Sequence, residues 1–196
     1  GMEVEPVLRR VGELASGRRP AEAAGSPAAS PAVGEHPHPA DPALFAQREA
    51  LKLALQVPVH AGPVFDAVDE TAYTHPAYIV LRLAVASAGG ASAGVAGAVW
   101  MDKVAAACTD DVARGLTAEL AVEPLRTDGE ADVDYASKIL SRLQEMAVTR
   151  QAVQLKSKLQ RVNPLEESDR YNRMFGELIA LEQYARALRE KGIERL

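Results

Sequence analysis

The last third of the chain constrains the fold most, because residues 133–196 are predicted to form two long, charge-rich helices joined by a turn. The break lies at Asn163-Pro164, a pair that is typical of a helix boundary. A helical hairpin of this length has too little apolar surface to form a core of its own. It must therefore pack on the preceding residues or present a surface to a partner.

The first helix of this hairpin, at about residues 133–161, carries two apolar stripes. One contains Ala136, Ile139, Leu140, Leu143 and Ala147, and the other contains Val148, Ala152, Leu155, Leu159 and Val162. The second stripe is displaced by one residue, which rotates it by about 100° around the helix axis. We expect the first half to pack on the preceding bundle and the second half on the final helix. A break in the helix near Val148–Arg150 would explain the displacement equally well.

The final helix has a single apolar face. That face consists of Tyr171, Met174, Phe175, Leu178, Leu181, Ala185 and Leu188. We expect the helix to begin at Asn163-Pro164, with Asn163 as its N-cap, although Ser168 is a competing cap.

Residues 43–132 are predicted to form a helical bundle. Helix starts are expected at Asp41-Pro42, Gly62-Pro63, Thr74-His75-Pro76, Val95 and Thr109-Asp110-Asp111. No internal repeat or convincing strand is found. The predicted fold class is all-α, with a helical bundle followed by a long helix and a C-terminal helical hairpin.

The first 42 residues are predicted to lie outside this bundle. Glu3–Leu14 has helical apolar spacing, and we expect a short amphipathic helix at residues 1–15. Residues 16–42 are rich in Pro, Ala, Gly and Ser, and this composition predicts a flexible linker because it cannot offset its ordering entropy. Gly1-Met2 is typical of a tag-cleavage remnant, so we expect a piece of a longer protein.

Composition excludes some classes of function. The net charge of −5 argues against non-specific nucleic-acid binding by the whole chain. The charge is uneven, because residues 1–132 hold 10 basic and 18 acidic side chains and residues 133–196 hold 12 and 9. The apolar window 79–100 contains Arg82 and a glycine pair, Gly89-Gly90, and we interpret it as two helices of a globular domain rather than a membrane span.

No set of residues indicates catalysis, a metal or a cofactor. The single cysteine, Cys108, excludes an internal disulfide, fits a reducing cytoplasm and is expected to be a buried structural thiol. The chain contains no GxxxxGK[ST] motif and no strand-linked GxGxxG. Solvated helix faces account for the basic hairpin residues better than nucleic-acid binding does. Turn and cap roles account for the four histidines, His36, His38, His60 and His75.

Two segments of the chain carry a family resemblance. Residues 48–85 read REALKLALQVPVHAGPVFDAVDETAYTHPAYIVLRLAV, with an acid-led helix followed by an aromatic residue and x-P-x-Y. Residues 140–190 contain the turn QRVNP and the run YNRMFGELIALEQ. Together these segments resemble the C-terminal helicase-binding domain of bacterial DNA primase. Both occur in the expected order after a linker, and the Ala/Pro-rich, acid-rich style is similar to actinobacterial primases.

The resemblance implies a non-catalytic docking domain of primase, with the zinc-binding and polymerase domains elsewhere and residues 1–15 at the end of the polymerase domain. Its hairpin would bind the N-terminal domains of the replicative helicase hexamer and place RNA-primer synthesis at the replication fork, in the nucleoid. Among exposed or half-exposed residues of the bend and last helix, the candidate contacts are Arg161, Tyr171, Arg173, Glu177, Tyr184 and Arg189.

The resemblance also implies a second partner, the acidic tail of single-stranded-DNA-binding protein. Arg48 and Lys52, one turn apart on the first helix of the bundle, are the candidate residues for that tail.

Two alternatives remain open, an N-terminal-type domain of a replicative helicase and a self-associating helical scaffold. Residues 48–85 alone do not exclude the first, because the helicase's own N-terminal domain has a similar helical pattern. A helicase would continue into a nucleotide-binding domain with a phosphate loop, whereas this chain continues into the hairpin.

Overall fold

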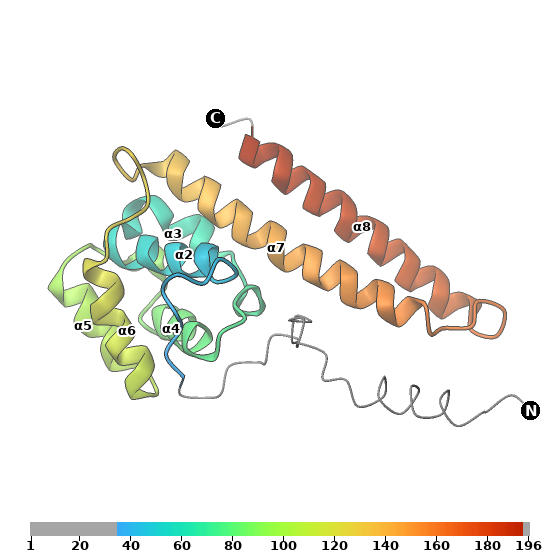
Figure 1. Cartoon of the computed structure of the whole chain (residues 1–196), viewed down its shortest axis with the longest axis horizontal. Helices are drawn as coiled ribbons and strands as arrows, with labels where there is room; N and C mark the ends of the chain where they lie inside the picture. The colour runs from blue at the N-terminus through green and yellow to red at the C-terminus, as the bar shows by residue number, and fades with distance from the viewer. Residues whose placement is uncertain (1–34, 194–196) are drawn as a thin grey trace, which may run out of the picture. The chain divides into compact units, whose positions relative to one another are not determined.

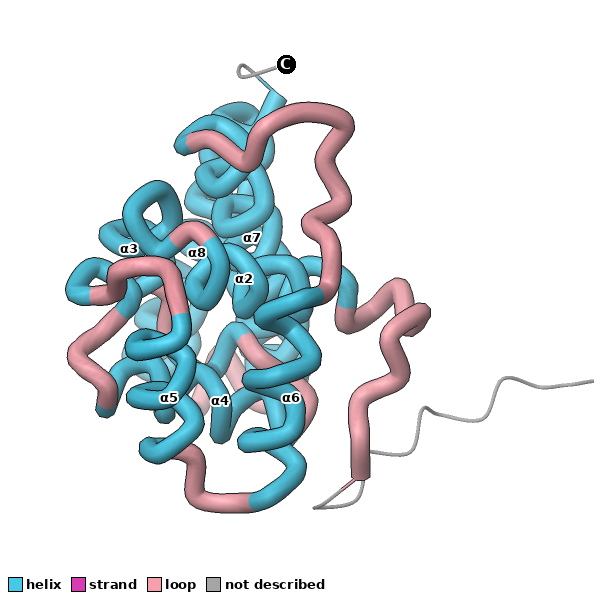
Figure 2. Tube along the Cα trace, turned by 90° about the vertical axis from the view of Figure 1, so that its left-hand side faces the viewer, coloured by secondary structure: helices cyan, strands magenta, loops and turns pink. Residues whose placement is uncertain are grey.

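The computed structural model describes residues 35–193, and every regular element in this range is helical (Figure 1). Figure 2 shows these helices joined by loops, with no strand in the described range. The elements are α2 (Phe45–Gln56), α3 (Pro58–Asp66), η1 (Glu70–Ala72), α4 (Pro76–Ser87), η2 (Ala91–Ala93), α5 (Ala98–Ala107), α6 (Asp111–Val122), α7 (Val133–Leu159) and α8 (Ser168–Ile193). The predicted all-α fold, a bundle followed by a long helix and a hairpin, is confirmed.

Helix α2 lies at the centre of the bundle. It packs against α3, α4, α6 and α7, so its side chains are covered in most directions. Leu51, Leu53 and Leu55 are fully buried, although they do not share one face of the helix. Helix α2 is therefore enclosed nearly all round, with every residue from Ala46 to Leu55 buried.

The enclosure of α2 buries charged side chains. Lys52 is 0% exposed, and its ammonium lies 2.6 Å from a carboxylate oxygen of Glu49 and donates to the Pro124 carbonyl oxygen at 2.8 Å. Arg48 is 4% exposed and donates through Nε to Glu123 at 2.9 Å. These bonds join α2 to the end of α6, and we call Arg48, Glu49, Lys52, Glu119 and Glu123 the buried charge cluster.

The buried charge cluster is hydrogen-bonded throughout. Burial alone would lower the pKa of Arg48, but its bonds to Glu123, Tyr78 and Glu119 raise that pKa above the ordinary value. The bond from Arg48 in turn lowers the pKa of Glu123. Glu49 accepts hydrogen bonds from the Tyr135 hydroxyl at 2.6 Å and from the Arg126 amide at 2.7 Å. The charges are therefore paired with protein groups, which is what makes their burial tolerable.

Helix α7 is continuous and uses two faces. Ala136, Leu140, Leu143 and Ala147 belong to the core of the bundle. Val148, Ala152 and Leu159 instead pack with residues of α8. The prediction that the two stripes serve two packing partners is confirmed, and the alternative break near residues 148–150 is wrong.

Three predicted helix starts are confirmed or close. His75 caps α4 by accepting a hydrogen bond from the Ala77 amide at its Nδ1 atom, with Pro76 as the first helical residue. Asp110 caps α6 by accepting from the Ala113 amide at 2.7 Å. The long helix begins at Val133, as expected, and Asp132 caps it.

Four other predicted starts are wrong by several residues. Helix α5 begins at Ala98 instead of Val95. Asp41 and Asn163 do not cap helices, because each accepts a hydrogen bond from the amide two residues on, which closes a turn before α2 and α8 begin. Helix α3 begins at Pro58, so Pro63 lies inside it. Gly62 is required for packing, since a Cβ there would lie 2.6 Å from the Ser92 Cα in η2.

The predicted helix at residues 1–15 and the linker residues 16–34 lie outside the described residues. Part of the remaining predicted linker, residues 35–42, contacts the bundle. Pro37 is buried, and the His36 Nε2 atom lies 2.9 Å from a carboxylate oxygen of Glu119 on α6.

The apolar window 79–100 contains the end of α4, the pair Gly89-Gly90, η2 and the start of α5. Both glycines have positive φ angles, 109° and 83°, which separate the two helices as predicted. In the described part of the chain, none of the helices combines the length and the apolar character needed to cross a membrane.

The buried charge cluster predicts an unequal effect of two charge deletions. Lys52→Ala leaves Glu49, which is 1% exposed, without its cation, and we expect the free energy of unfolding to fall by about 3–5 kcal/mol. Arg114→Ala removes an exposed pair with Asp111 and should lower it by less than about 1 kcal/mol. Urea denaturation followed by circular dichroism measures both, and equal losses would contradict the assigned role of Lys52.

His75 predicts a pH dependence of stability. Burial lowers its pKa below the ordinary value of 6.5, so the folded state binds its proton less readily than the unfolded state. The resulting stability is present above pH 6.5 and is lost as the pH falls through the folded-state pKa. His75→Asn keeps an N-cap acceptor and removes the titration. We expect urea titrations between pH 7.5 and 5 to give a flatter stability profile for this variant; an unchanged slope would contradict the prediction.

Candidate protein-binding surface

Helices α7 and α8 are held together by an apolar seam along one face of each. Ala152 and Leu159 of α7 pack with Leu178 of α8. Nearer the end of α8, Val148 packs with Ala185 and Leu188. In the described part of the chain, α7 is the element on which α8 packs extensively (Figure 1). The seam therefore covers one side of α8 and leaves the others exposed.

An ion triad joins α7 to α8 at the end of the seam that lies near the C-terminus of α8. Glu145 of α7 is 5% exposed and accepts hydrogen bonds from Arg189 of α8, at 2.8 Å from Nη2 and 3.2 Å from Nε. Arg142, one turn earlier on α7, pairs with the other carboxylate oxygen. Burial alone would raise the pKa of Glu145, but the two arginines lower it below the ordinary value. The carboxylate is thus held in its charged form between two cations.

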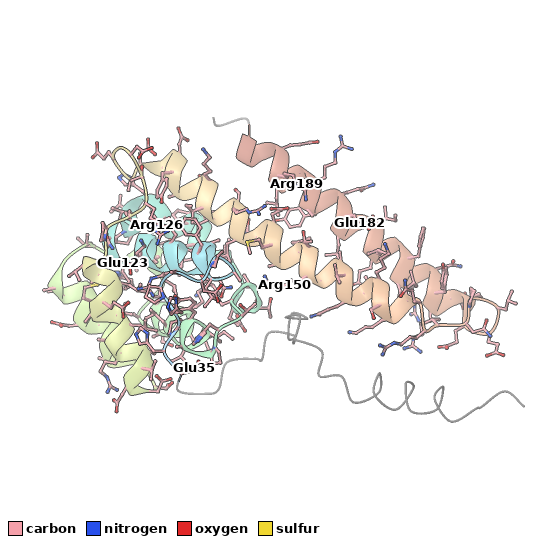
Figure 3. The ribbon with its side chains drawn as sticks, viewed as in Figure 1. Glu35, Glu123, Arg126, Arg150, Glu182 and Arg189 are labelled. Atoms are coloured by element: carbon pink, nitrogen blue, oxygen red, sulfur yellow. The ribbon has the colours of Figure 1, made fainter. Side chains whose placement is uncertain are left out.

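Two of the predicted contact residues are engaged within the hairpin. Arg189 is bonded to Glu145, and Figure 3 shows its side chain on α8 beside α7. Tyr171 is half-buried in the seam, where its ring stacks on Phe175 with centroids 6.3 Å apart. Both side chains therefore have a structural role in the hairpin.

The other four predicted contact residues are exposed. Arg173, Glu177 and Tyr184 lie four and seven residues apart along α8, a spacing that puts them on one side of the helix. Tyr184 is 49% exposed. Arg161 lies separately, in the turn that joins α7 to α8. The structure brings three of the six candidates together on one side.

The predicted tail-binding pair, Arg48 and Lys52, is not exposed. Both side chains lie in the buried charge cluster, with side-chain exposures of 5% and 0%. An acidic peptide cannot reach them without unfolding the contact between α2 and α6. Their assignment as tail-binding residues is wrong for this reason. The apolar pattern did not reveal the burial because it treats every Arg and Lys as a surface residue.

Two shallow pockets flank Thr149 on α7. The first, of about 340 Å³, is bordered by Ala43, Gln47 and Thr74 of the bundle side and by Arg142 and Arg150 of α7. Arg150 donates to the Ala72 carbonyl oxygen at 2.7 Å and has no carboxylate partner among the described residues (Figure 3). The second pocket, of about 310 Å³, lies between α7 and α8 beside Lys156 and Arg186. Cations border both pockets.

The sequence pattern missed two features of the hairpin surface. Phe175 was predicted on the buried face of the last helix but is 47% exposed, and Ile179, one turn on, is 38% exposed. Their four-residue spacing is the signal that identifies an exposed apolar pair. Glu145 was also missed, because no pattern links it to an arginine 44 residues away.

The one cysteine of the chain is a structural thiol, as predicted. Cys108 is 5% exposed, and burial raises its pKa above the ordinary value.

The arrangement of α7 and α8 offers apolar and charged side chains suited to binding another protein.

Comparison with known proteins gives consistent results. Residues 47–174 match the family model described as DNA primase DnaG DnaB-binding. DNA primase of Mycobacterium tuberculosis strain H37Rv is 46% identical over 188 residues, covering 95% of this chain and 29% of the relative. DNA primase of Streptomyces coelicolor is 35% identical over 160 residues, covering 80% and 25%. The chain thus spans less than a third of these relatives.

A solved structure is also similar. The helicase binding domain of primase from Mycobacterium tuberculosis has 47% sequence identity and a TM-score of 0.62, covering 76% of this chain and 92% of the other. The family match over most of the bundle and hairpin, together with these relatives, shows that the chain belongs to the DnaB-binding domain family of DNA primase DnaG, of actinobacterial type.

Proposed function

We propose that this chain is a docking domain that binds the replicative helicase and so places RNA-primer synthesis at the replication fork, in the cytoplasm at the nucleoid. The matching family is described by DnaB binding, and the similar mycobacterial structure is a helicase binding domain. The observation that carries the proposal here is the one-sided packing of α8, which is 26 residues long and leaves most of its circumference exposed. A helix exposed in this way is suited to receive a partner.

The domain itself is proposed to be non-catalytic. Its relatives are DNA primases about three to four times longer than the aligned region. Polymerase and zinc-binding chemistry would reside in those other parts of the parent protein. The boundaries proposed for the piece are an upstream helix at residues 1–15, a linker at 16–42, the bundle at 43–132 and the hairpin at 133–196.

The proposed helicase contacts are the exposed residues of the bend and the last helix. Arg173, Glu177 and Tyr184 form one polar side of α8, and Arg161 lies at the turn. Arg189 and Tyr171 are assigned positioning roles, because Arg189 pairs with Glu145 of α7 and Tyr171 packs in the seam. Tyr and Arg are the residue types that contribute most at protein interfaces.

Substitution of Tyr184 and Arg189 should separate binding from positioning. We expect Tyr184→Ala to raise the Kd for the helicase N-terminal domain about fivefold or more, without changing the melting temperature. Arg189→Ala should lower the melting temperature as well, because it leaves the buried Glu145 with one cation instead of two. Isothermal titration calorimetry and thermal circular dichroism measure the two effects. Tyr184→Ala binding as tightly as the unaltered chain would remove this residue from the proposed contact.

A second proposed partner is the acidic tail of single-stranded-DNA-binding protein. With Arg48 and Lys52 buried, we propose that the tail uses the cations beside the 340 Å³ pocket, Arg142 and Arg150. Among the described residues, the guanidinium of Arg150 donates hydrogen bonds only to the backbone carbonyl oxygens of Thr71 and Ala72. Its positive charge is therefore available to an acidic peptide.

A fluorescent tail peptide tests this second partner. Arg150→Ala should weaken peptide binding about threefold to tenfold in low salt, and the effect should shrink as salt screens the charges. Arg114→Ala, which removes an exposed arginine of α6, is the matched control. Equal peptide affinities for the two variants would contradict the assignment of the pocket.

A further inference from the structure

Between Asp169 and Arg186, the side of α8 turned away from the seam carries no charge. Residues at successive helical positions share this side and are all exposed: Asn172, Phe175, Gly176, Ile179, Ala180 and Gln183. We call this set the uncharged stripe. From Asn172 to Gln183 it extends about 16 Å along the helix axis.

Unlike the uncharged stripe, the exposed surface of α8 around it carries charged side chains. One border of the stripe carries Arg173 and Glu177, and the other carries Glu182. The stripe ends at Arg186, which pairs with Glu190. Within the stripe, Phe175 and Ile179 are exposed on adjacent turns, at 47% and 38%. A centre depleted of charge, with an aromatic residue and a charged rim, is the composition that distinguishes the core of a protein interface.

Gly176 provides a second, independent observation. Glycine is among the least favourable residues in a helix interior. A Cβ at this position would have nothing within 4 Å, and Gly176 does not have a positive φ. Neither the packing nor the backbone of this chain therefore requires glycine here. Ala180, one turn later, is also small, so the two residues together permit close approach of another backbone.

We infer that the uncharged stripe is the core of the helicase contact. It packs against one helix of the helicase N-terminal domain, and the ridge of side chains on that helix which faces the stripe is uncharged and apolar. This inference rests on the proposed function. The partner ridge must be uncharged at its centre, because a charge buried against Gly176 and Ala180 would have no counter-ion. Its flanks carry both signs of charge, complementary to Arg173 and Glu177 on one border, to Glu182 on the other and to Arg186 at the end of the stripe. Arg173, Glu177 and Tyr184 then form part of the polar rim.

The test uses the full chain and the isolated N-terminal domain of the helicase. Ala180→Arg places a charge in the centre of the stripe and should raise the Kd about tenfold or more. Gly176→Ala should raise the melting temperature through higher helix propensity, yet weaken binding several-fold by blocking close approach. Ala106→Arg, the same exchange at an exposed position of α5, is the matched control and should leave the Kd unchanged.

The outcomes separate the inference from the proposed function. If the unaltered chain does not bind the helicase domain, the proposed function fails and this inference fails with it. If it binds, and both Ala180→Arg and Gly176→Ala bind equally well, the stripe is not the core of the contact while the function stands. A dimer of the unaltered chain that Ala180→Arg dissociates in sedimentation would assign the stripe to a second copy and overturn the inference. Weaker binding by both variants, with higher stability for Gly176→Ala, supports it.

Discussion

Helix α7 has two buried faces about 100° apart, and the packing of both the bundle and α8 depends on its continuity between them. Leu140 and Leu143 lie in the bundle core, whereas Ala152 and Leu159 lie in the seam with α8. A helix with one face would satisfy one partner only. Because α7 passes from the first face to the second without a break, α8 is attached to the bundle through a rigid element and not through a flexible hinge.

Buried ion pairs join helices at two places in this structure, one inside the bundle and one between α7 and α8. The buried charge cluster joins α2 to the end of α6, inside the bundle. Glu145 joins α7 to α8 through Arg189, at the edge of the seam. The apolar contact area of the seam is small, since six residues make up its buried part in the described range. The pair between Glu145 and Arg189 therefore adds a charged contact to a seam that buries few apolar residues.

The sequence was sufficient for features that depend on local spacing. Pro76 after His75, and Asp110 before α6, mark helix starts because capping is a contact between near neighbours. Asn163 and Asp41 were wrongly predicted as N-caps. Their side chains close turns by accepting from the amide two residues on, and such a turn has the same sequence signature as a helix N-cap. The burial of Arg48 and Lys52 depends on Glu119 and Glu123, more than 70 residues away, and no periodicity encodes that contact. For the same reason, sequence spacing grouped Phe175 with the seam, although the direction of α8 on α7 leaves it exposed.

The extension of α7 beyond the bundle has a consequence for assembly. Ala147 is the last α7 residue in the bundle core, and the helix continues to Leu159, about 18 Å further along its axis. A protein bound at the distal part of the hairpin, as proposed above, would therefore be held away from the bundle, at a distance set by the number of helical residues between them.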